Sequence, residues 1–347
     1  MNKKICFPFV GDTLGGSHIS SLELIKQLKR SNHQVDVVLH KKGVLYNYLK
    51  NKKIEFKFLK IDNIAGQSGS ILHTIFLLFK NFYLLKCYIK KNKIDLVHGN
   101  DLRINLSWGF ASIYNVVFIW HQRTIFKKMS LLIFPIYFFS DYIISISKTV
   151  KTSLPKILHR KTKVIFNPIS VKKINRKINK KKINICFVSR PTFEKGFDLF
   201  LKIIEKINDE RIYYNIYLSR DIKKTKKRIR FLKNNNKINV YGFTKFENIA
   251  KKNEILIAPS YSEGFGRTII EASICKMTVI ASSIDAHKEI SKNFVKINIV
   301  KNEYQNYLNC IKKILKKQKT SFQLIKNLDY FSVKSHYFAI RKIYEKI

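Results

Sequence analysis

The sequence lacks the patterns that mark several common classes of protein. Its five cysteines are widely scattered and include no Cys-x-x-Cys pair, which argues against structural zinc and a disulfide framework and favours a reduced, cytoplasmic protein. No stretch approaches the ~20 uninterrupted apolar residues that a membrane-spanning helix needs. The basic and then apolar residues 1–10 are too short for a signal peptide, so we expect them to form a first β-strand.

Acidic residues are also scarce, since 23 Asp and Glu stand against 67 Lys and Arg for a net charge of +44. Such a charge suggests nucleic acid or an anionic membrane surface as a partner. However, the lysines are spread through nearly every segment, which fits compositional drift at solvent-facing positions. A nucleic-acid-binding protein would gather its cations on one face with interleaved aromatics, so we expect no nucleic acid partner.

One segment keeps an anionic membrane surface open as a partner. Residues Ile71 to Lys93 have helical spacing and mix aromatic residues such as Phe76 with lysines such as Lys80. The segment is either an amphipathic basic face that lies on lipid headgroups or a core helix with a lysine-rich outer side.

At 347 residues the chain is longer than one hydrophobic core usually supports, so we expect two domains. Short apolar runs alternate with helical stretches in both halves, which predicts an α/β protein with two doubly wound, Rossmann-like parallel sheets. Two such domains that face one another leave a cleft at the carboxyl ends of their strands. We assign residues 1–167 to the first domain, 168–182 to a linker, 183–330 to the second domain and 331–347 to a closing helix.

The expected strands are short and largely apolar, as buried parallel strands are. In the first half they are Lys4–Val10, Val35–Leu39, Glu55–Leu59, Asp95–His98, Val116–Trp120, Tyr142–Ser145 and Lys163–Phe166. In the second half they are Ile183–Ser189, Tyr214–Leu218, Ile238–Tyr241, Ile255–Ala258, Thr278–Ala281 and Val295–Ile299. The first helix is expected over Ser17–Arg30, where apolar residues recur at helical spacing.

The most informative motif is a pair of glutamates eight positions apart, Glu263 and Glu271. The apolar run before them ends at Pro259, and a glycine-bearing loop then leads into a helix near Thr268. The free backbone N–H groups of the loop and the helix dipole favour an anion such as a phosphate, with one carboxylate on each side of it. Alternatively, Thr268 and Glu271 form an ordinary capping box beside a surface glutamate.

Three other segments follow expected strands and carry polar or glycine residues. The first strand leads to Gly15 and Gly16, which either let the backbone approach a phosphate or make a tight turn. The strand that opens the second half leads to Arg190 and Lys195, whose cations match a diphosphate, although two loop cations are also expected by chance in so basic a chain. His121 follows the fifth strand and either faces the cleft or is a structural histidine.

No two aspartates stand at Asp-x-Asp spacing anywhere in the chain. Enzymes that bind a nucleotide diphosphate through a metal ion usually carry such a pair of carboxylates. We therefore expect neither a metal site nor a cofactor.

In this order, these residues resemble the family 4 glycosyltransferases, which have the GT-B architecture of two facing Rossmann-like domains. The resemblance covers essentially the whole chain and is most specific in the second half. It rests on Gly15-Gly16, Asp95–His98, Val117–His121, Asp141–Ser147, Lys163–Pro168, Ser189–Gly196, Val240–Gly242 and Pro259–Ala272. The chain departs from the family pattern at Ser189, Ser219-Arg220, Lys276 and Thr278, where the family usually has glycine or proline.

The resemblance implies a role for each candidate residue in binding a nucleotide diphosphate sugar. Arg190 and Lys195 would hold the diphosphate, together with backbone N–H groups at Gly15-Gly16. Val240 to Gly242 would line the base pocket, and Glu271 would bind the ribose. The phosphate loop would be formed by Gly264, Phe265, Gly266, Arg267 and Thr268. Glu263 would contact the transferred sugar and His121 would lie at the reaction centre.

The implied reaction is a retaining, metal-independent glycosyl transfer to a cell-surface glycan. Charge and family habit together suggest a lipopolysaccharide or lipid-linked oligosaccharide acceptor, with the first domain on the acceptor side. We expect a cytoplasmic enzyme, peripheral at the inner face of the membrane. A sugar-nucleotide epimerase of the same architecture is the alternative, and a basic nucleic-acid-binding protein is a distant one.

Overall fold

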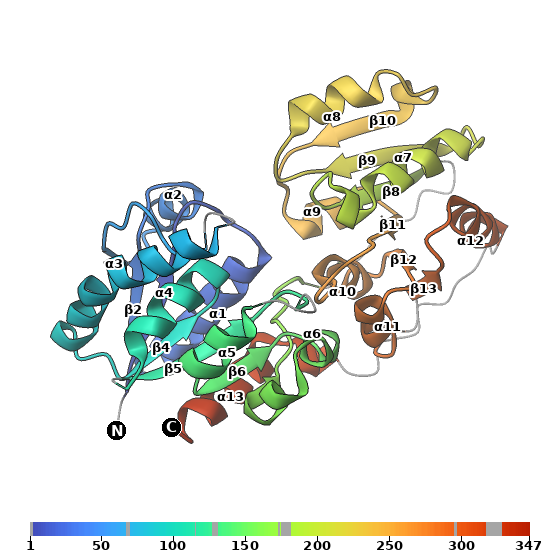
Figure 1. The fold of residues 1–347 in the computed structure, drawn as a ribbon. Helices are drawn as coiled ribbons and strands as arrows, with labels where there is room; N and C mark the ends of the chain where they lie inside the picture. Colours follow the sequence, from blue (N-terminus) through green and yellow to red (C-terminus); the bar gives the residue numbers. More distant parts are fainter. Residues whose placement is uncertain are drawn as a thin grey trace. The chain divides into compact units, whose positions relative to one another are not determined.

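Apolar runs that alternate with amphipathic helices give the chain two parallel β-sheets, each flanked by helices (Figure 1). The computed structural model describes residues 3–66, 70–114, 116–126, 131–172, 174, 182–294, 297–316 and 328–347. Two compact units contain them, Met1–Pro168 with Tyr330–Ile347, and Ile169–Asp329. The predicted α/β class is confirmed. Much of the predicted linker lies outside the described residues.

The first unit is built on a seven-stranded sheet in the order β3-β2-β1-β4-β5-β6-β7. Its strands are β1 (Lys4–Phe9), β2 (Gln34–Leu39), β3 (Lys57–Phe58), β4 (Leu96–Gly99), β5 (Val117–Gln122), β6 (Tyr142–Ser145) and β7 (Thr162–Val164). Its helices are α1 (Gly16–Arg30), α2 (Val44–Asn51), α3 (Ile71–Lys91), α4 (Leu102–Ser112), α5 (Ile133–Phe139), α6 (Lys148–Ser153) and α13 (Val333–Tyr344), with 3-10 turns at Lys156–Lys161 and Leu328–Phe331.

The second unit is built on a six-stranded sheet in the order β10-β9-β8-β11-β12-β13. Its strands are β8 (Ile183–Val188), β9 (Ile212–Tyr217), β10 (Ile238–Tyr241), β11 (Ile255–Ala258), β12 (Thr278–Ser282) and β13 (Ile297–Val300). Its helices are α7 (Phe197–Lys206), α8 (Ile222–Ile229), α9 (Phe246–Lys252), α10 (Arg267–Ile274), α11 (Asp285–Ser291) and α12 (Tyr304–Lys316), with 3-10 turns at Phe193–Lys195 and Asn235–Lys237.

In both sheets the strand order reverses next to the first strand of the unit. β1 lies between β2 and β4, and β8 lies between β9 and β11. Neighbouring strands run parallel, so the loops that leave β1 and β4, or β8 and β11, emerge together at one edge. Loops at such a reversal are where open α/β sheets bind ligands.

Several predicted element boundaries are wrong by one or more residues, mostly where pairing runs out. The predicted strand Glu55–Leu59 is only β3, because an edge strand has one neighbour and pairs with β2 over two residues. The predicted helix Ile71–Lys93 ends at Lys91, since Lys93 adopts a left-handed conformation with φ of 50°. Of the predicted strand 295–299, residues 295 and 296 lie outside the described residues.

Helix α13 belongs to the first unit although it ends the chain. Its Ile340 and Ile343 are fully buried in a cluster with residues such as Ile5 and Leu28, from β1 and α1. The hydroxyl of Tyr344 lies 2.6 Å from the Nδ1 atom of His98, at the end of β4. The last helix therefore completes one side of the core of the first unit.

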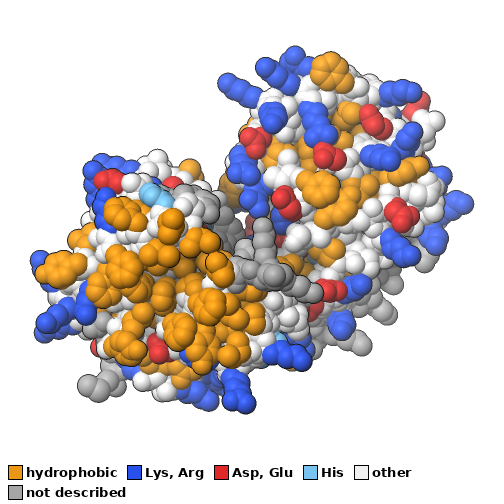
Figure 2. Space-filling view, viewed as in Figure 1, with side chains coloured by type: hydrophobic (Ala, Val, Ile, Leu, Met, Phe, Trp, Pro, Cys, Tyr) orange, Lys and Arg blue, Asp and Glu red, His pale blue; other side chains and the backbone are white. Residues whose placement is uncertain are grey.

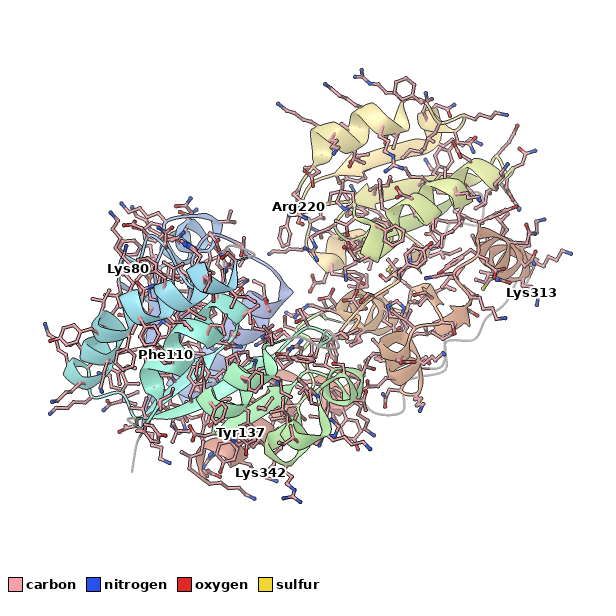
Figure 3. All side chains as sticks on the ribbon, viewed as in Figure 1. Lys80, Phe110, Tyr137, Arg220, Lys313 and Lys342 are labelled. Atoms are coloured by element: carbon pink, nitrogen blue, oxygen red, sulfur yellow. The ribbon has the colours of Figure 1, made fainter. Side chains whose placement is uncertain are left out.

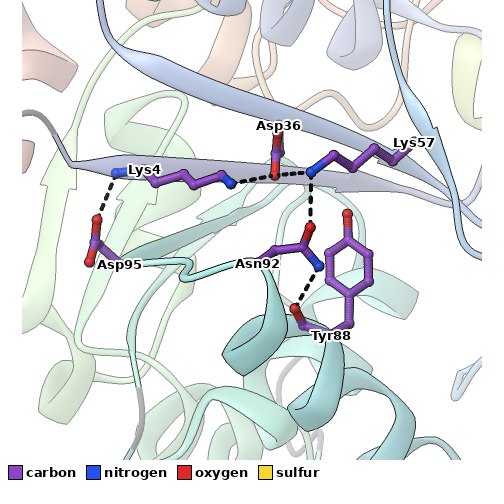
Figure 4. A network of polar contacts seen from close by, with 6 residues as sticks. All are labelled: Lys4, Asp36, Lys57, Tyr88, Asn92 and Asp95. Atoms are coloured by element: carbon purple, nitrogen blue, oxygen red, sulfur yellow. Dashed lines mark hydrogen bonds and ion pairs between the residues drawn. The ribbon is translucent and has the colours of Figure 1, made fainter.

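A polar network joins the starts of several strands of the first unit to the end of α3 (Figure 4). The Lys57 ammonium lies 2.8 Å from the Asp36 carboxylate and donates to Asn92 over 2.9 Å. Asp36 also pairs with Lys4 at 3.5 Å, and the Lys4 amide donates to Asp95 over 2.7 Å. Partly exposed pairs contribute little to stability one by one, but this network fixes the position at which α3 ends.

Among the described residues, no helix is long and apolar enough to cross a membrane. The apolar stretch near Pro135 forms the short helix α5.

We expect Ile340→Ala to lower the free energy of unfolding of the first unit by about 2–5 kcal/mol, because it leaves a cavity in a closed core. Urea denaturation followed by tryptophan fluorescence measures this, since Trp108 and Trp120 both lie in that unit. The matched Ile257→Ala variant, equally buried but in the second unit, should shift the tryptophan transition much less. A wild-type transition for Ile340→Ala would contradict the packing of α13.

Candidate functional site

Two loops meet at the strand-order reversal of the second unit. One leaves β8 and runs through Arg190 and Lys195 to α7, and the other leaves β11 and runs from Pro259 to α10. Because β8 and β11 are paired neighbours, with Cys186 opposite Leu256, both loops emerge at the same edge of the sheet.

Backbone hydrogen bonds and close packing lock these two loops together. The amides of Tyr261 and Ser262 donate to the carbonyl of Glu194 over 2.8 and 3.2 Å, and the rings of Phe193 and Tyr261 stack with centroids 4.8 Å apart. Gly196 has φ of +68°, and a Cβ atom there would lie 1.9 Å from the Pro259 carbonyl oxygen. Only glycine fits this position, both in conformation and in space.

The loops surround a small pocket with charged and polar walls. It has about 250 Å³ of empty space, part of it open to solvent, and its walls include Ser189, Lys195, Ser260, Glu263 and Thr268. The Lys195 ammonium and the Glu263 carboxylate are paired directly across it. Its charged walls suit a charged part of a ligand.

The first turn of α10 borders this pocket. Gly266 directly precedes the helix with φ of +79°. As a glycine it has no side chain that could cap the first turn. The start of a helix favours an anion, because the helix dipole and the first-turn N–H groups point there.

The alternative interpretation of Thr268 and Glu271 as a capping box is wrong. Because Gly266 takes the left-handed conformation, the helix begins at Arg267 and Thr268 lies inside its first turn. Glu271 instead accepts a hydrogen bond from the Arg267 Nε atom over 2.8 Å, four residues away on the same face. Burial raises the pKa of Glu271 above its ordinary value, against the opposing effect of Arg267.

In the first unit, His121 lies within β5 and is buried, so the prediction that it follows the strand is wrong. Its Nδ1 atom is 3.0 Å from His98 Nε2 and 3.3 Å from the Arg123 guanidinium. The positive charge of Arg123 beside His121 Nδ1 favours a lone pair at that nitrogen, and His98 Nε2 then donates to it. His98 Nδ1 accepts from the Tyr344 hydroxyl.

These contacts favour one tautomer of His121. Its Nε2 atom carries the remaining proton and has no hydrogen-bond partner among the described residues. A buried N–H group without a partner is costly in a folded protein, so a ligand acceptor at this nitrogen would satisfy it.

The glycines after β1 lie at the turn from that strand into α1. Gly15 directly precedes α1, and its amide donates to His18 Nδ1 over 3.1 Å. That amide is therefore engaged by the protein itself. The same loop is held by a bidentate pair in which Arg103 donates to the Asp12 carboxylate over 2.6 and 3.1 Å.

The two halves of the chain match two family models. Residues 14–173 match the model described as Glycosyltransferase Family 4, and residues 169–329 match Glycosyl transferases group 1. The chain belongs to the group 1, family 4 glycosyltransferases. This confirms the predicted family and the predicted class of enzyme.

Individual relatives agree with the assignment. The glycosyltransferase is 27% identical to an uncharacterised glycosyltransferase of Methanocaldococcus jannaschii, over 99% of this chain and 97% of that protein. It is 23% identical to the capsular polysaccharide biosynthesis glycosyltransferase CapH of Staphylococcus aureus, over 81% of each chain.

Solved structures confirm the GT-B architecture. The structure of Anabaena HepE in complex with UDP and glucose matches with a TM-score of 0.79 at 16% identity, over 99% of this chain and 100% of that one. A UDP-GlcNAc 2-epimerase of Methanocaldococcus jannaschii matches with a TM-score of 0.66 at 15% identity, over 99% and 100%. At these identities the likeness concerns the fold alone.

Other candidate residues of the glycosyltransferase fall into two groups. Arg190 is exposed directly after the pocket residue Ser189, and within the described chain its guanidinium makes no hydrogen bond or ion pair. Val240 and Gly242 lie at the sheet edge on β10 and just after it, with Val240 packed against the core, and neither lines the pocket. The structure thus brings Lys195, Glu263 and Thr268 together and leaves Val240 and Gly242 apart from them.

Three residues that sequence reasoning missed brace the loop after β11. The Ser260 carbonyl accepts from the Ser282 hydroxyl over 2.6 Å and from the Asn302 amide over 3.0 Å. Because the Ser282 hydroxyl donates to Ser260, its oxygen accepts from His287 Nδ1 at 3.0 Å. Each is a single polar residue far along the chain from Ser260, so no local sequence pattern predicts its contact with this loop.

Gly196→Ala should loosen the paired loops, because it forces a side chain into the left-handed region and against the Pro259 carbonyl. We expect faster hydrogen–deuterium exchange in peptides covering residues 189–197 and 259–267. Gly242→Ala is the matched control, since a Cβ atom there meets only the flexible end of Ile222 at 3.3 Å. Wild-type exchange in Gly196→Ala would mean that the loops do not depend on this contact.

Stability should fall as the pH drops from about 6.5 towards 4. Burial lowers the pKa of His98 and His121 well below the ordinary value, and lowers that of His287 and His336 to about 4. In this window the unfolded chain binds protons that the folded protein does not, so each such histidine costs up to about 1.4 kcal/mol per pH unit.

The contribution of one site histidine is measured by comparing His287→Gln with the wild type. Its free energy of unfolding, from urea denaturation followed by circular dichroism, should vary less steeply between pH 7 and pH 5. The exposed His73→Gln variant serves as control. Identical slopes for His287→Gln and the wild type would contradict the role assigned to burial.

Proposed function

We propose that this enzyme is a retaining, metal-independent glycosyltransferase that moves a sugar from a nucleotide diphosphate sugar to a lipid-linked or polysaccharide acceptor. One observation carries the proposal. Lys195, Glu263 and Thr268, from two separate loops, surround one pocket at the strand-order reversal of the second unit. A cation, a carboxylate and a helix start at such a place suit a diphosphate with a sugar attached.

The diphosphate would take over the lysine that now pairs with a glutamate. Lys195 and Arg190 would neutralise the phosphates, and the first-turn amides of α10 would donate to their oxygens. When Lys195 leaves Glu263 for a phosphate, the Glu263 carboxylate is released to accept hydrogen bonds from the hydroxyls of the transferred sugar.

Glu271 suits the ribose of the nucleotide. Its carboxylate is nearly buried and is oriented by the Arg267 guanidinium, so it presents acceptor oxygens in a fixed direction. Ribose hydroxyls are donors of the right kind for such a carboxylate. Gly264, Phe265 and Gly266 would shape the phosphate loop, and Val240 to Gly242 would lie towards the base.

His121 would contribute a hydrogen bond at the reaction centre. Its Nε2–H group, set by His98 and Arg123, would donate to a hydroxyl of the transferred sugar. The Gly15-Gly16 backbone would approach the phosphates, and for Gly15 this requires the amide to exchange His18 for a phosphate oxygen.

In the proposed reaction the bond between the anomeric carbon and the diphosphate oxygen breaks. The acceptor oxygen bonds to the same carbon on the same face, and the acceptor proton passes to the leaving phosphate oxygen. The protein stabilises the negative charge that grows on the diphosphate, which is the role of Lys195, Arg190 and the helix start. No protein carboxylate acts as nucleophile, in contrast to a retaining glycosidase.

The acceptor class rests on the likeness to CapH, a glycosyltransferase of capsular polysaccharide biosynthesis. From this likeness we infer a lipid-linked or polysaccharide acceptor, and we place the enzyme in the cytoplasm at the inner face of the membrane. A sugar-nucleotide epimerase is the second candidate, favoured by the fold match to the UDP-GlcNAc 2-epimerase. An epimerase would convert the donor sugar without any acceptor.

A thermal-shift screen against a panel of nucleotide diphosphate sugars tests donor binding. A donor at about a hundredfold above its Kd should stabilise the protein by about 2.7 kcal/mol. Lys195→Ala and Glu271→Ala should lose the shift while keeping the wild-type circular dichroism spectrum, and should slow transfer by about a hundredfold or more.

Matched controls are Lys251→Ala and Glu205→Ala, both exposed on helices of the same unit. Donor turnover is then followed with and without a lipid extract as acceptor. Nucleotide diphosphate release that needs the extract supports transfer, whereas a changed sugar in the absence of acceptor supports the epimerase. Wild-type turnover in Lys195→Ala or Glu271→Ala would refute the assigned site.

A further inference from the structure

Helix α3 is apolar on its exposed side as well as on its buried side. Leu77, Leu85 and Ile89 face the core, whereas Leu72 and Tyr83 are 80% and 76% exposed on the opposite face. A helix that is hydrophobic all round is normally buried. The exposed apolar face of α3 is therefore a candidate binding surface.

Aromatic contacts make this face continuous with that of α5. Phe110 of α4 contacts Phe79 of α3 with ring centroids 5.3 Å apart, and Phe139 of α5 at 5.5 Å. Figure 3 labels Phe110 between these helices, and Figure 2 shows hydrophobic side chains gathered on the same face of the first unit. We define the apolar patch by its exposed residues: Ile71, Leu72, Ile75, Phe76, Phe79, Tyr83, Leu84, Leu131, Phe134, Tyr137 and Phe138.

The two helices that carry the apolar patch have no acidic residue. Helix α3 carries four lysines and no acidic residue, and α5 carries no charged residue. Lys86 and Lys90 continue the exposed stripe of α3 beyond Tyr83, at helical spacing. At the other side, the Lys161 ammonium lies 4.8 Å from the centre of the Tyr137 ring. Apolar side chains beside cations match the acyl and headgroup layers of an anionic bilayer.

The apolar patch is held in place by the fold. The buried Asn81 side chain of α3 donates to the Asn63 carbonyl over 2.9 Å, and the polar network at Asn92 fixes the end of the helix. Docking on a surface then needs no ordering of this helix, which lowers the entropic cost of binding.

We propose that the apolar patch, with Lys80, Lys86 and Lys90, docks the enzyme on an anionic membrane surface. This inference rests on the proposed function, because it brings the enzyme to the layer that holds a lipid-linked acceptor. A second copy of the chain is a poorer occupant, since two chains of net charge +44 repel each other whereas anionic lipids attract each of them.

Co-sedimentation with phosphatidylcholine vesicles, with and without phosphatidylglycerol, tests the docking. The full chain should bind the vesicles that contain phosphatidylglycerol, and less so at high salt. Leu72→Gln/Phe76→Gln/Tyr83→Gln should bind about tenfold more weakly or worse, because it removes exposed apolar area from a helix that glutamine still supports. Lys86→Gln/Lys90→Gln should also bind about tenfold more weakly, and only to the anionic vesicles.

Controls of matched chemistry lie elsewhere on the protein. Phe231→Gln/Tyr330→Gln removes aromatic residues that are 88% and 58% exposed, and Lys224→Gln/Lys227→Gln removes two exposed lysines of α8. Both should bind vesicles as the wild type does. Vesicle binding requires no sugar donor, so a missing thermal shift would count against the proposed function and leave the docking result intact.

Three results would overturn the docking proposal. The first is wild-type protein that does not sediment with anionic vesicles, and the second is equal binding by the wild type and the triple glutamine variant. The third is a dimer in light scattering that the triple variant converts to a monomer, because a second copy would then cover the apolar patch.

Discussion

The contact on which the candidate site depends is the packing of the loop after β8 against the loop after β11. The Glu194 carbonyl accepts two amides of the facing loop, and Gly196 allows the backbones to touch at Pro259. These contacts bring the Lys195 and Glu263 side chains to one pocket. Without them, a lysine and a glutamate that lie 68 residues apart in sequence would have no reason to meet.

The first unit shows the same dependence on long-range packing. Tyr344, three residues before the last residue of the chain, contacts the imidazole of His98, which in turn orients His121. The resulting tautomer leaves the His121 Nε2–H group without a partner in the described chain. A hydrogen-bond donor that is prepared in advance costs nothing to reorganise when a substrate arrives.

The exposed surface of the protein is of two kinds, one rich in lysines and one apolar. Exposed helix faces such as that of α8 carry lysines, which fits compositional drift at solvent-facing positions. The apolar patch over α3 and α5 departs from this rule, because its aromatic residues stay exposed beside lysines. The helix spacing alone could not separate a core face from a docking face, since both faces of α3 are apolar.

Sequence reasoning predicted much of the fold because the signals are local. Apolar runs such as Ile255–Ala258 are recognisable strands, and the structure has that strand at the predicted residues. The predicted strand boundaries were wrong where a tertiary neighbour decides the pairing, as at the edge strand β3. The capping box at Thr268 failed because Gly266 adopts a backbone conformation that no spacing rule fixes.

The sequence by itself determined the α/β class, the family and the order of the candidate residues, because periodicity and short motifs are properties of neighbouring positions. Only the tertiary structure decided that Lys195 pairs with Glu263, and that Ser282, His287 and Asn302 brace the loop. It also separated Val240 and Gly242 from the pocket. The physical reason is that these contacts join residues by sheet order and loop packing, which are set by burial over the whole unit.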